Sequence, residues 1–347
     1  MNNIKMSGLK ISETAEELKN NCQIAVEIIK KAKRITITSH RNPDGDAIGS
    51  ELGLYYYVKN YADEVRIINH SPVPYNYEFL VGSDDIYLYE AARDDEYILN
   101  SDLIIVADVN DTYRLQSVGE PVRNSKAVKL LIDHHLAPKD FANHCVVDCE
   151  ASSTGEIVWK MIREDVGAII SPEAAAPLYA AIMTDTGSFR YPRTDAELHA
   201  IVSDLIACGA DPVSIYDEIY NRMPVRAMRL LGEAYSGMEL FHGGKLCIMI
   251  LKNEHFDNAK AEFDDVEGFV ETAMSMDGVK IAVLLTEKKN SDELRISFRS
   301  KADYEVRDVA VSLNGGGHKQ ASGARVSGIA IEEAKKIIAE KFASRLK

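Results

Sequence analysis

Three apolar runs in the sequence lead directly into histidine or aspartate, and this arrangement constrains the fold more than any other feature. The runs occupy residues 34–39, 103–107 and 127–132. They show little of the alternation typical of a half-exposed strand, which indicates burial on both faces, as in a mostly parallel sheet covered by helices. Because ligands bind at the carboxyl ends of the strands in such sheets, we expect the polar residues that follow these runs to share one site.

The length of the chain and the order of its patterns indicate two domains. A chain of 347 residues is long enough for two domains of roughly 150 residues each. In the first half, helical patterns alternate with five strand patterns: residues 34–39, 65–69, 103–109, 128–132 and 145–147. We predict an α/β fold made of three parts: a mostly parallel sheet flanked by helices (1–194), a helical linker (195–240) and a smaller α/β domain (241–347).

The composition excludes several classes of protein. A formal net charge of -14 opposes binding of long nucleic acid, which depends on many Lys and Arg contacts with phosphates. No apolar run approaches the roughly 18 residues needed to cross a bilayer, and residues 1–21 lack the apolar centre of a signal peptide. The five cysteines are scattered, which predicts reduced thiols. We therefore expect a cytoplasmic protein without a membrane segment, with a homodimer as the default assembly.

The first polar cluster follows the run at residues 34–39. His40 comes directly after it, and Asp44 and Asp46 flank Gly45 in a turn that leads into a helical pattern at residues 46–59. A turn of this kind can direct both carboxylates into one cleft. One of the two aspartates could instead be the N-cap of the helix, but capping would not explain two aspartates together with His40. The cluster therefore favours a metal site.

The second cluster is the tripeptide Asp133, His134 and His135, at the end of the run at residues 127–132. A single histidine at a strand end is more often structural than a ligand, and two in a row are harder to explain in that way. Neighbours on a strand point to opposite faces, so we expect the two rings to have different roles. One would bind metal while the other faces the substrate, and Asp133 could orient an imidazole.

Asp108 and Asp185 are weaker candidates by themselves. Asp108 follows the run at residues 103–107 and could be a turn former, while Asp185 ends an apolar helical pattern and could be a cap. Together with the two clusters they complete a set of six ligands without thiolate: His40, Asp44, Asp46, Asp108, His134 and Asp185. Such a set suits two hard or borderline ions, with Mn²⁺ as the expected metal and Mg²⁺ or Co²⁺ as substitutes. Two such ions roughly 3.5–4 Å apart stabilise phosphoryl transfer to water.

A glycine-rich segment in the second half predicts a phosphate-binding loop. Its backbone amides could approach an anion, and its basic side chains could add positive charge. Its members are Gly315, Gly316, Gly317, His318 and Lys319. A flexible connection between two elements remains the alternative for the glycines. Arg299, at the end of a strand pattern, could grip a phosphate with two parallel hydrogen bonds or could simply be solvated.

These motifs resemble the signatures of the DHH/DHHA1 phosphoesterases. The resemblance rests on the segment from His40 to Ser50, on the Asp133, His134 and His135 tripeptide, and on the glycine-rich segment that ends in His318 and Lys319. It spans nearly the whole chain in the expected order. Within the family, the chain is similar to the NrnA-type oligoribonucleases, which often also act as phosphatases on adenosine 3′,5′-bisphosphate.

The resemblance implies a role for each residue of these motifs. It implies two Mn²⁺ sites that share Asp108: one formed by His40, Asp44 and Asp108, the other by Asp46, Asp108, His134 and Asp185. It places His135 beside the substrate phosphate and Asp133 in support of the site. It also implies that the smaller domain grips the nucleotide through its glycine-rich loop, His318 and Arg299.

The resemblance also implies the activity. The expected reaction is the hydrolysis of very short oligonucleotides, and of adenosine 3′,5′-bisphosphate, by water activated between two metal ions. Two alternatives remain open. The chain could prefer cyclic or linear dinucleotides that serve as signals, or it could be a nucleotide-binding regulator without turnover.

Overall fold

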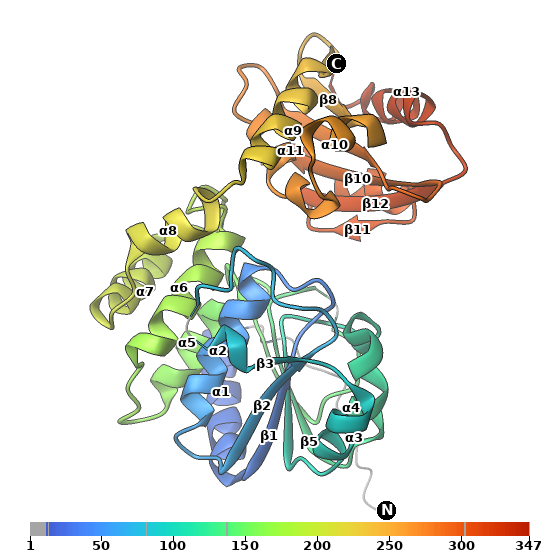
Figure 1. Ribbon diagram of the computed structural model, residues 1–347. Helices are drawn as coiled ribbons and strands as arrows, with labels where there is room; N and C mark the ends of the chain where they lie inside the picture. The colour runs from blue at the N-terminus through green and yellow to red at the C-terminus, as the bar shows by residue number, and fades with distance from the viewer. Residues whose placement is uncertain (1–11, 13, 81, 137, 302, 347) are drawn as a thin grey trace, which may run out of the picture. The chain divides into compact units, whose positions relative to one another are not determined.

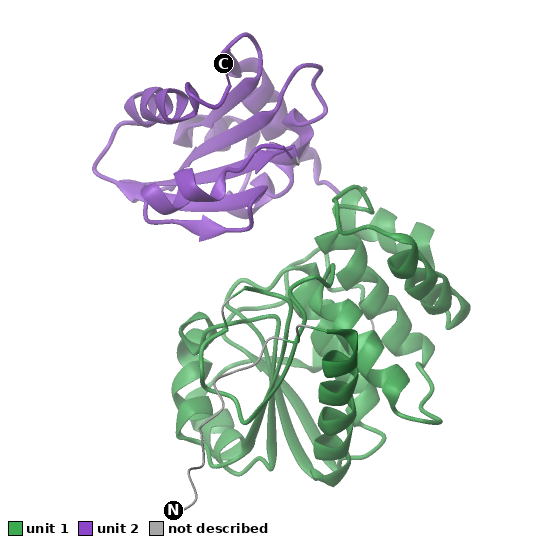
Figure 2. Cartoon of the chain, turned by 180° about the vertical axis from the view of Figure 1, so that it is seen from behind, with its two compact units in different colours: residues 1–222 green, residues 223–347 purple. Residues whose placement is uncertain are grey.

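A computed structural model of the chain describes residue 12 and residues 14–80, 82–136, 138–301 and 303–346. The chain divides into two compact units, residues 1–222 and residues 223–347 (Figures 1 and 2). Part of the N-terminal segment for which the sequence predicts no signal peptide, residues 1–11 and 13, lies outside the described residues.

The first unit is built on a six-stranded, fully parallel sheet with the strand order β3-β2-β1-β4-β5-β6. Its strands are β1 (Arg34–Thr38), β2 (Glu64–Asn69), β3 (Ile86–Leu88), β4 (Leu103–Ala107), β5 (Val128–Asp133) and β6 (His144–Val147). The central strand β1 pairs Ile35 with Leu103 of β4. The sheet is the mostly parallel one that the apolar runs predict, and the predicted fold class is confirmed.

Helices cover both faces of this sheet (Figure 1). One face packs against α1 (Ala15–Lys31), α2 (Gly45–Val58), α5 (Thr154–Glu164) and α6 (Pro172–Asp185). The other face packs against α3 (Ala91–Leu99), the 3-10 helix Thr112–Val118 and α4 (Gly119–Asn124). Successive side chains of β4 pack on opposite faces of the sheet. Ile105 packs on the face covered by α1, α2, α5 and α6, and Ile104 and Val106 pack on the other face. This two-sided burial explains why the run shows no polar alternation.

The second unit contains a mixed six-stranded sheet with the order β11-β12-β10-β9-β8-β7. Its strands are β7 (Glu239–Phe241), β8 (Leu246–Leu251), β9 (Ile281–Glu287), β10 (Glu293–Ser300), β11 (Gly316–Gly317) and β12 (Ala321–Ser327). Only β8 and β9 pair in parallel. One face packs against α12 (Arg307–Ser312) and α13 (Ile331–Phe342), and the other against α9 (Val225–Ser236), α10 (Asn253–Ala259) and α11 (Phe269–Ala273).

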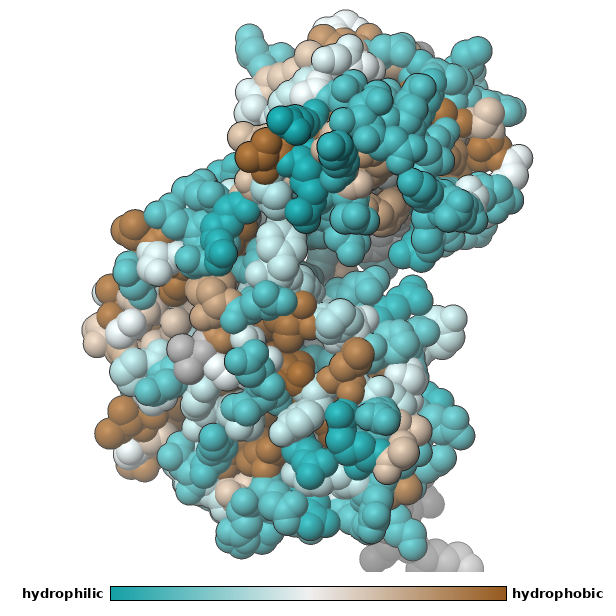
Figure 3. All heavy atoms as spheres, viewed as in Figure 1, coloured by the Kyte–Doolittle hydropathy of each residue, from teal (hydrophilic) through white to brown (hydrophobic). Residues whose placement is uncertain are grey.

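The segment predicted as a helical linker, residues 195–240, is divided between the units. Helices α7 (Ala196–Ala207) and α8 (Pro212–Tyr220) belong to the first unit, and α9 belongs to the second. Exposed apolar side chains are scattered over both units (Figure 3), among them Val213 of α8 and Met228 of α9. Among the described residues, no single helix is long and apolar enough to cross a membrane. The pair α7 and α8 meets that criterion only jointly, and the two helices are bent by 102° at their break.

A row of glycines brings α2 and α6 into close contact. Gly45, Gly49 and Gly53 are spaced four residues apart on α2 and all face α6. A Cβ built on Gly49 would lie 2.3 Å from the carbonyl oxygen of Pro177 and 2.8 Å from the Cβ of Ala181. This close approach has a consequence for the site, because Asp46 lies in the first turn of α2 and Asp185 is the last residue of α6.

We expect Gly49→Ala to lower the free energy of unfolding by about 1–3 kcal/mol, since the two helices must separate to accept the methyl group. The same change at Gly232 is a matched control, because a Cβ there would meet no atom within 4 Å. Urea unfolding followed by circular dichroism measures both variants. Equal stability of Gly49→Ala and the parent would show that α2 and α6 are not tightly packed here.

Candidate metal centre

The structure brings the six predicted metal ligands of the first unit to one edge of the parallel sheet. They come from the segments after β1, β4 and β5, from the start of α2 and from the end of α6. Ligand atoms of His40, Asp44 and Asp108 lie within 4.8 Å of one another, and so do those of Asp46, Asp108 and His134. Asp185 joins the second group, with Oδ2 3.5 Å from Nε2 of His134. The edge is formed by the carboxyl ends of the strands, as the sequence predicts.

Asp108 lies at the centre of both groups. Its Oδ2 is 3.3 Å from Nε2 of His40, and its Oδ1 is 3.7 Å from Nε2 of His134. The residue has a positive φ of 56°, a conformation that aspartate tolerates better than most residues, and its amide donates to the carbonyl oxygen of Ile132 in β5. One carboxylate therefore faces two separate clusters of ligands, as a bridging group between two ions must.

The two histidines of the centre are held in the tautomer that a metal ion needs. Nδ1 of His40 donates to the carbonyl oxygen of Arg41 (2.8 Å), and Nδ1 of His134 faces the carbonyl oxygen of Ala151 at 3.4 Å. Because a carbonyl can only accept, the proton lies on Nδ1, and Nε2 keeps its lone pair for a ligand. In both rings Nε2 points to the carboxylates.

Asp44 has the capping role that the sequence left open and is still close to the centre. Its Oδ1 accepts from the amide of Ala47 and caps α2, while its Oδ2 lies 3.9 Å from Nε2 of His40. Each oxygen therefore has its own partner, so capping and metal binding do not exclude one another.

Asp46 is held by a helix end that sequence reasoning did not connect with the site. Its two oxygens accept from the amides of Thr154 (2.7 Å) and Gly155 (2.9 Å), at the start of α5, and from the hydroxyl of Ser50. The hydroxyl of Thr154 also donates to Asp108. A helix N-terminus carries partial positive charge, so α5 stabilises two carboxylates. The sequence pattern at residues 153–156, a serine followed three residues later by glutamate, indicates that a helix begins there. It does not indicate which side chain lies opposite the start of that helix.

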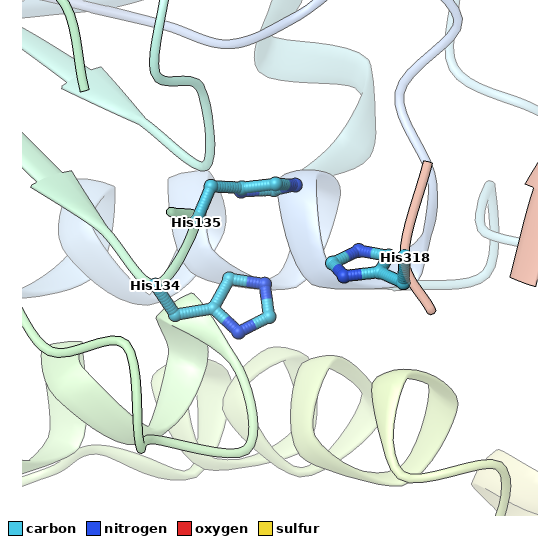
Figure 4. Close-up of side chains that lie close together, drawn as sticks. All are labelled: His134, His135 and His318. Carbon is cyan, nitrogen blue, oxygen red and sulfur yellow. The ribbon is translucent and has the colours of Figure 1, made fainter. Parts of the chain in front are cut away.

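The expectation that His134 and His135 point to opposite faces of a strand is wrong. Strand β5 ends at Asp133, so strand alternation does not apply beyond it. The two rings are neighbours, with centroids 4.8 Å apart and planes at 77° (Figure 4). Their surroundings still differ: His134 faces three carboxylates, while Nδ1 of His135 pairs with Oδ1 of Asp133 at 2.8 Å.

The carboxylates of the centre repel one another. Burial, together with the charges of Asp108, Asp185 and Asp44, raises the pKa of Asp46 well above its ordinary value. Burial and the neighbouring aspartates raise the pKa of Asp185 to about 6. Burial alone would raise the pKa of Asp108 too, but the histidines around it hold that pKa low. Among the described residues, the ion pairs of these three carboxylates are made with histidine only. This donor set suits divalent cations, which would neutralise the charge.

Unlike Asp46 and Asp185, whose charged forms are disfavoured, His135 is stabilised in its charged form. Burial disfavours its charged form, but Asp133 and Asp108 outweigh that effect and raise the pKa of His135 to about 9. Its side chain keeps 18% of its surface exposed, whereas the side chains of His134 and Asp108 keep 2% each. His135 is therefore the ring of this pair that solvent, or a substrate, can reach.

The residues predicted to bind phosphate lie in the second unit. Arg299 is the penultimate residue of β10, where Nε donates to Oε1 of Glu271 (2.6 Å) and Nη1 donates to the carbonyl oxygen of Phe298. The glycine-rich segment forms the hairpin of β11 and β12, in which the amides of Gly315 and His318 already donate to Ala310 and Ala321. Those two amides are not available to an anion, so the loop offers fewer donors than three consecutive glycines suggest.

The comparisons with known proteins agree with this geometry. Residues 34–182 match the DHH family, N-terminal domain, and residues 243–344 match the DHHA1 domain. The bifunctional oligoribonuclease and PAP phosphatase NrnA of Thermus thermophilus is 28% identical over 318 residues, which cover 90% of each chain. The cyclic-di-AMP phosphodiesterase PdeA of Listeria monocytogenes is 25% identical over 338 residues, covering 90% of this chain and 48% of that protein.

A solved structure is similar over most of the chain. The crystal structure of an exopolyphosphatase-related protein from Bacteroides fragilis has a TM-score of 0.89 and 33% sequence identity, and the match covers 94% of this chain and 98% of that one. The two matched domains and the histidine–carboxylate centre define a phosphoric ester hydrolase. The chain belongs to the DHH/DHHA1 family of phosphoesterases, which confirms the resemblance predicted from its motifs.

A further buried acid, which the sequence did not single out, is linked by hydrogen bonds to the ends of β1 and β2. Glu51 of α2 is fully buried and accepts through Oε2 from the amide nitrogen of Asn69, whose Oδ1 accepts from the backbone amide of Ser39. Its other oxygen, Oε1, has no hydrogen-bond partner in the described part of the chain. Burial raises the pKa of Glu51 from 4.5 to about 8. The group is therefore neutral at pH 7.

We expect Glu51→Gln to become more stable than the parent as the pH rises. The pKa of Glu51 is higher in the folded than in the unfolded chain, so the parent loses stability between about pH 4.5 and pH 8 and glutamine does not. The difference should be near zero at pH 4.5 and about 4–5 kcal/mol at pH 8 and above. Denaturant unfolding in chelator measures it, with Glu340→Gln on α13 as the control for loss of one charge. A difference that does not change with pH would contradict a neutral, buried Glu51.

Proposed function

We propose that this chain is a manganese-dependent phosphodiesterase that hydrolyses very short oligonucleotides to mononucleotides and also converts adenosine 3′,5′-bisphosphate to AMP. The observation that carries the proposal is the position of Asp108, whose two oxygens face two different groups of histidine and carboxylate ligands. The name of the Thermus thermophilus relative supports this choice of substrates.

The distances at the centre support the two ligand sets that the resemblance implies. One ion would be held by His40, Asp44 and Asp108, and the other by Asp46, Asp108, His134 and Asp185. When bound, two such ions lower the pKa of water and neutralise charge that develops on the phosphoryl oxygens. The hydrogen bonds of Asp46 to the start of α5 keep that carboxylate in one orientation.

His135 and Asp133 would act on the substrate side of the centre. Asp133 accepts from both the amide and Nδ1 of His135, which fixes the ring. In this orientation Nε2 can donate a hydrogen bond to a phosphoryl oxygen. A donor that is already fixed costs no reorganisation when charge develops.

Arg299 would bind the substrate through the part of its guanidinium that remains available. Nε is held by Glu271 and Nη1 by the carbonyl oxygen of Phe298. Within the described residues, Nη2 has no recorded hydrogen bond, and the two existing bonds fix the plane of the group. An arginine positioned in this way can bind a phosphate with little loss of side-chain freedom. His318 and Lys319 would add donors from the neighbouring hairpin.

A linear or cyclic dinucleotide is the second candidate substrate. Its support is the similarity to the cyclic-di-AMP phosphodiesterase, of which this chain covers about half. Initial rates on a dinucleotide, a cyclic dinucleotide, a pentanucleotide and the bisphosphate, measured side by side, separate the two proposals. A nucleotide that binds in Mn²⁺ and is never cleaved would indicate a regulator.

We expect His134→Ala to reduce turnover by about 10²-fold or more, because the variant lacks a proposed metal ligand, while its stability in chelator changes little. The measurement is a product time course on a labelled trinucleotide with Mn²⁺, with Mg²⁺ and with chelator.

His144→Ala is the matched control, since it removes an imidazole from the start of β6, at the other end of the sheet. It should retain the parent rate. Equal activity of His134→Ala and the parent at matched Mn²⁺ would remove the basis of the proposed function, and so would full activity of the parent in chelator.

A further inference from the structure

The turn between β6 and α5, residues 148–153, lies against both histidines that follow β5. The carbonyl oxygen of Ala151 faces Nδ1 of His134 at 3.4 Å, and Sγ of Cys149 donates to the carbonyl oxygen of His135 at 3.4 Å. The first contact determines which ring nitrogen of His134 carries the proton. The position of this turn therefore affects the orientation of a proposed metal ligand.

The same turn leads directly into the helix end that holds the carboxylates of the centre. The amides of Thr154 and Gly155, at the start of α5, donate to Asp46, and the hydroxyl of Thr154 donates to Asp108. Because the turn and the start of the helix are continuous, a shift of the turn would disturb the contacts of the histidines and of both aspartates together.

The hydrogen bonds inside this turn do not fix the carbonyl group of Ala151. The amide of Ala151 donates to the carbonyl oxygen of Asp148, and the amide of Ser152 donates to Glu156 of α5. Both bonds use donors of the turn. Irregular segments are generally more mobile than the helices and strands that they connect, so the carbonyl oxygen needs a donor from another part of the chain to be held in place.

Arg193, in the segment between α6 and α7, supplies that donor. Its Nη1 donates to the carbonyl oxygen of Ala151 at 2.7 Å. A carbonyl oxygen has two lone pairs, so it can accept from Arg193 and face Nδ1 of His134 at the same time. The segment that carries Arg193 starts directly after Asp185, the last residue of α6. Arg193 therefore connects the segment that follows one proposed metal ligand with the turn that supports another.

The guanidinium of Arg193 forms this bond although acidic side chains lie nearby. It lines a cavity of about 300 Å³ whose wall includes Asp148, Glu150 and Glu197. Within the described residues, no ion pair of Arg193 is recorded, whereas Lys160 of the same cavity pairs with a carboxylate at 2.6 Å. A hydrogen bond from a charged donor is stronger than one between neutral groups. Removal of Arg193 would therefore remove the contact with the turn without breaking a recorded ion pair.

We propose that Arg193 is a positioning residue of the metal centre. By holding the carbonyl oxygen of Ala151, it keeps the turn at residues 148–153 in the conformation that orients His134 and places the start of α5 against Asp46. Among the described residues it makes no recorded bond to a proposed metal ligand, so its effect is transmitted through the turn. This inference rests on the proposed function and adds to it a residue from outside the motif segments.

The test compares Mn²⁺ binding by the parent and by Arg193→Ala, without substrate. We expect the dissociation constant for Mn²⁺ to rise about 10-fold, the lower end of the effect of removing a group that orients a metal ligand, because Arg193 acts through a carbonyl. Arg193→Lys keeps a charged donor for a single acceptor and should recover most of the loss. Arg123→Ala, which removes an exposed arginine from α4 on the other face of the sheet, is the control and should match the parent.

Hydrogen exchange in chelator provides a measurement that does not depend on metal. If Arg193 holds the turn, the amides of residues 151–155 exchange faster in Arg193→Ala, while those of the central strands β1 and β4 exchange as in the parent. A role in overall stability alone would accelerate exchange in the strands as well. That result, or an equal loss of Mn²⁺ affinity in Arg123→Ala, overturns the inference.

Turnover separates this inference from the proposed function. In Arg193→Ala the Mn²⁺ concentration that gives half-maximal activity should rise with the dissociation constant, while kcat at saturating Mn²⁺ stays within about twofold of the parent. A parent that hydrolyses a trinucleotide, with a variant of unchanged Mn²⁺ affinity, contradicts the inference and leaves the proposed function standing. A parent whose Mn²⁺ affinity depends on Arg193 but which cleaves no phosphate ester supports the inference and contradicts the proposed function.

Discussion

The structure of the first unit depends on one unfavourable arrangement, the burial of three carboxylates around the Nε2 atom of His134. Their mutual repulsion raises the pKa of Asp46 and Asp185. An isolated buried charge would normally be lost to protonation, and here several parts of the fold oppose that outcome. The start of α5 donates two amides to Asp46, the histidines lie against Asp108, and the glycine row of α2 allows α6 to bring Asp185 close. Such an arrangement is stable when cations share the site.

Much of this arrangement follows from the sequence, because parallel strands and their following loops have a simple geometry. The strand predicted at residues 128–132 is observed as β5 (Val128–Asp133), and the one at residues 34–39 as β1 (Arg34–Thr38). Residues that follow neighbouring parallel strands must meet at one edge, which is why His40, Asp44, Asp46, Asp108 and His134 could be grouped in advance. Asp185 ends α6 and follows no strand, so it joined the set only because the other five were present. Short elements such as β3 and the two-residue β11 carry too few residues for a periodic pattern.

The contacts that could not be predicted are those set by register and by helix packing. No pattern in the sequence shows that the amides of Thr154 and Gly155 point to Asp46, or that Glu51 is buried with Asn69 as its partner. The orientation of His135 depended on the residue at which β5 ends, and a shift of one position reverses the expected face. In the second unit, only the register of β10, β12 and β11 shows that Arg295 and Arg325 are opposed across the sheet.

The central claim is that Asp108 is shared by two ions, and anomalous diffraction from crystals grown with Mn²⁺ tests it most directly. The account predicts two anomalous peaks about 3.5–4 Å apart, both in contact with the carboxylate of Asp108, with His40 at one and His134 at the other. A single peak, or two peaks that do not share Asp108, in crystals of protein that is active with Mn²⁺, would contradict it.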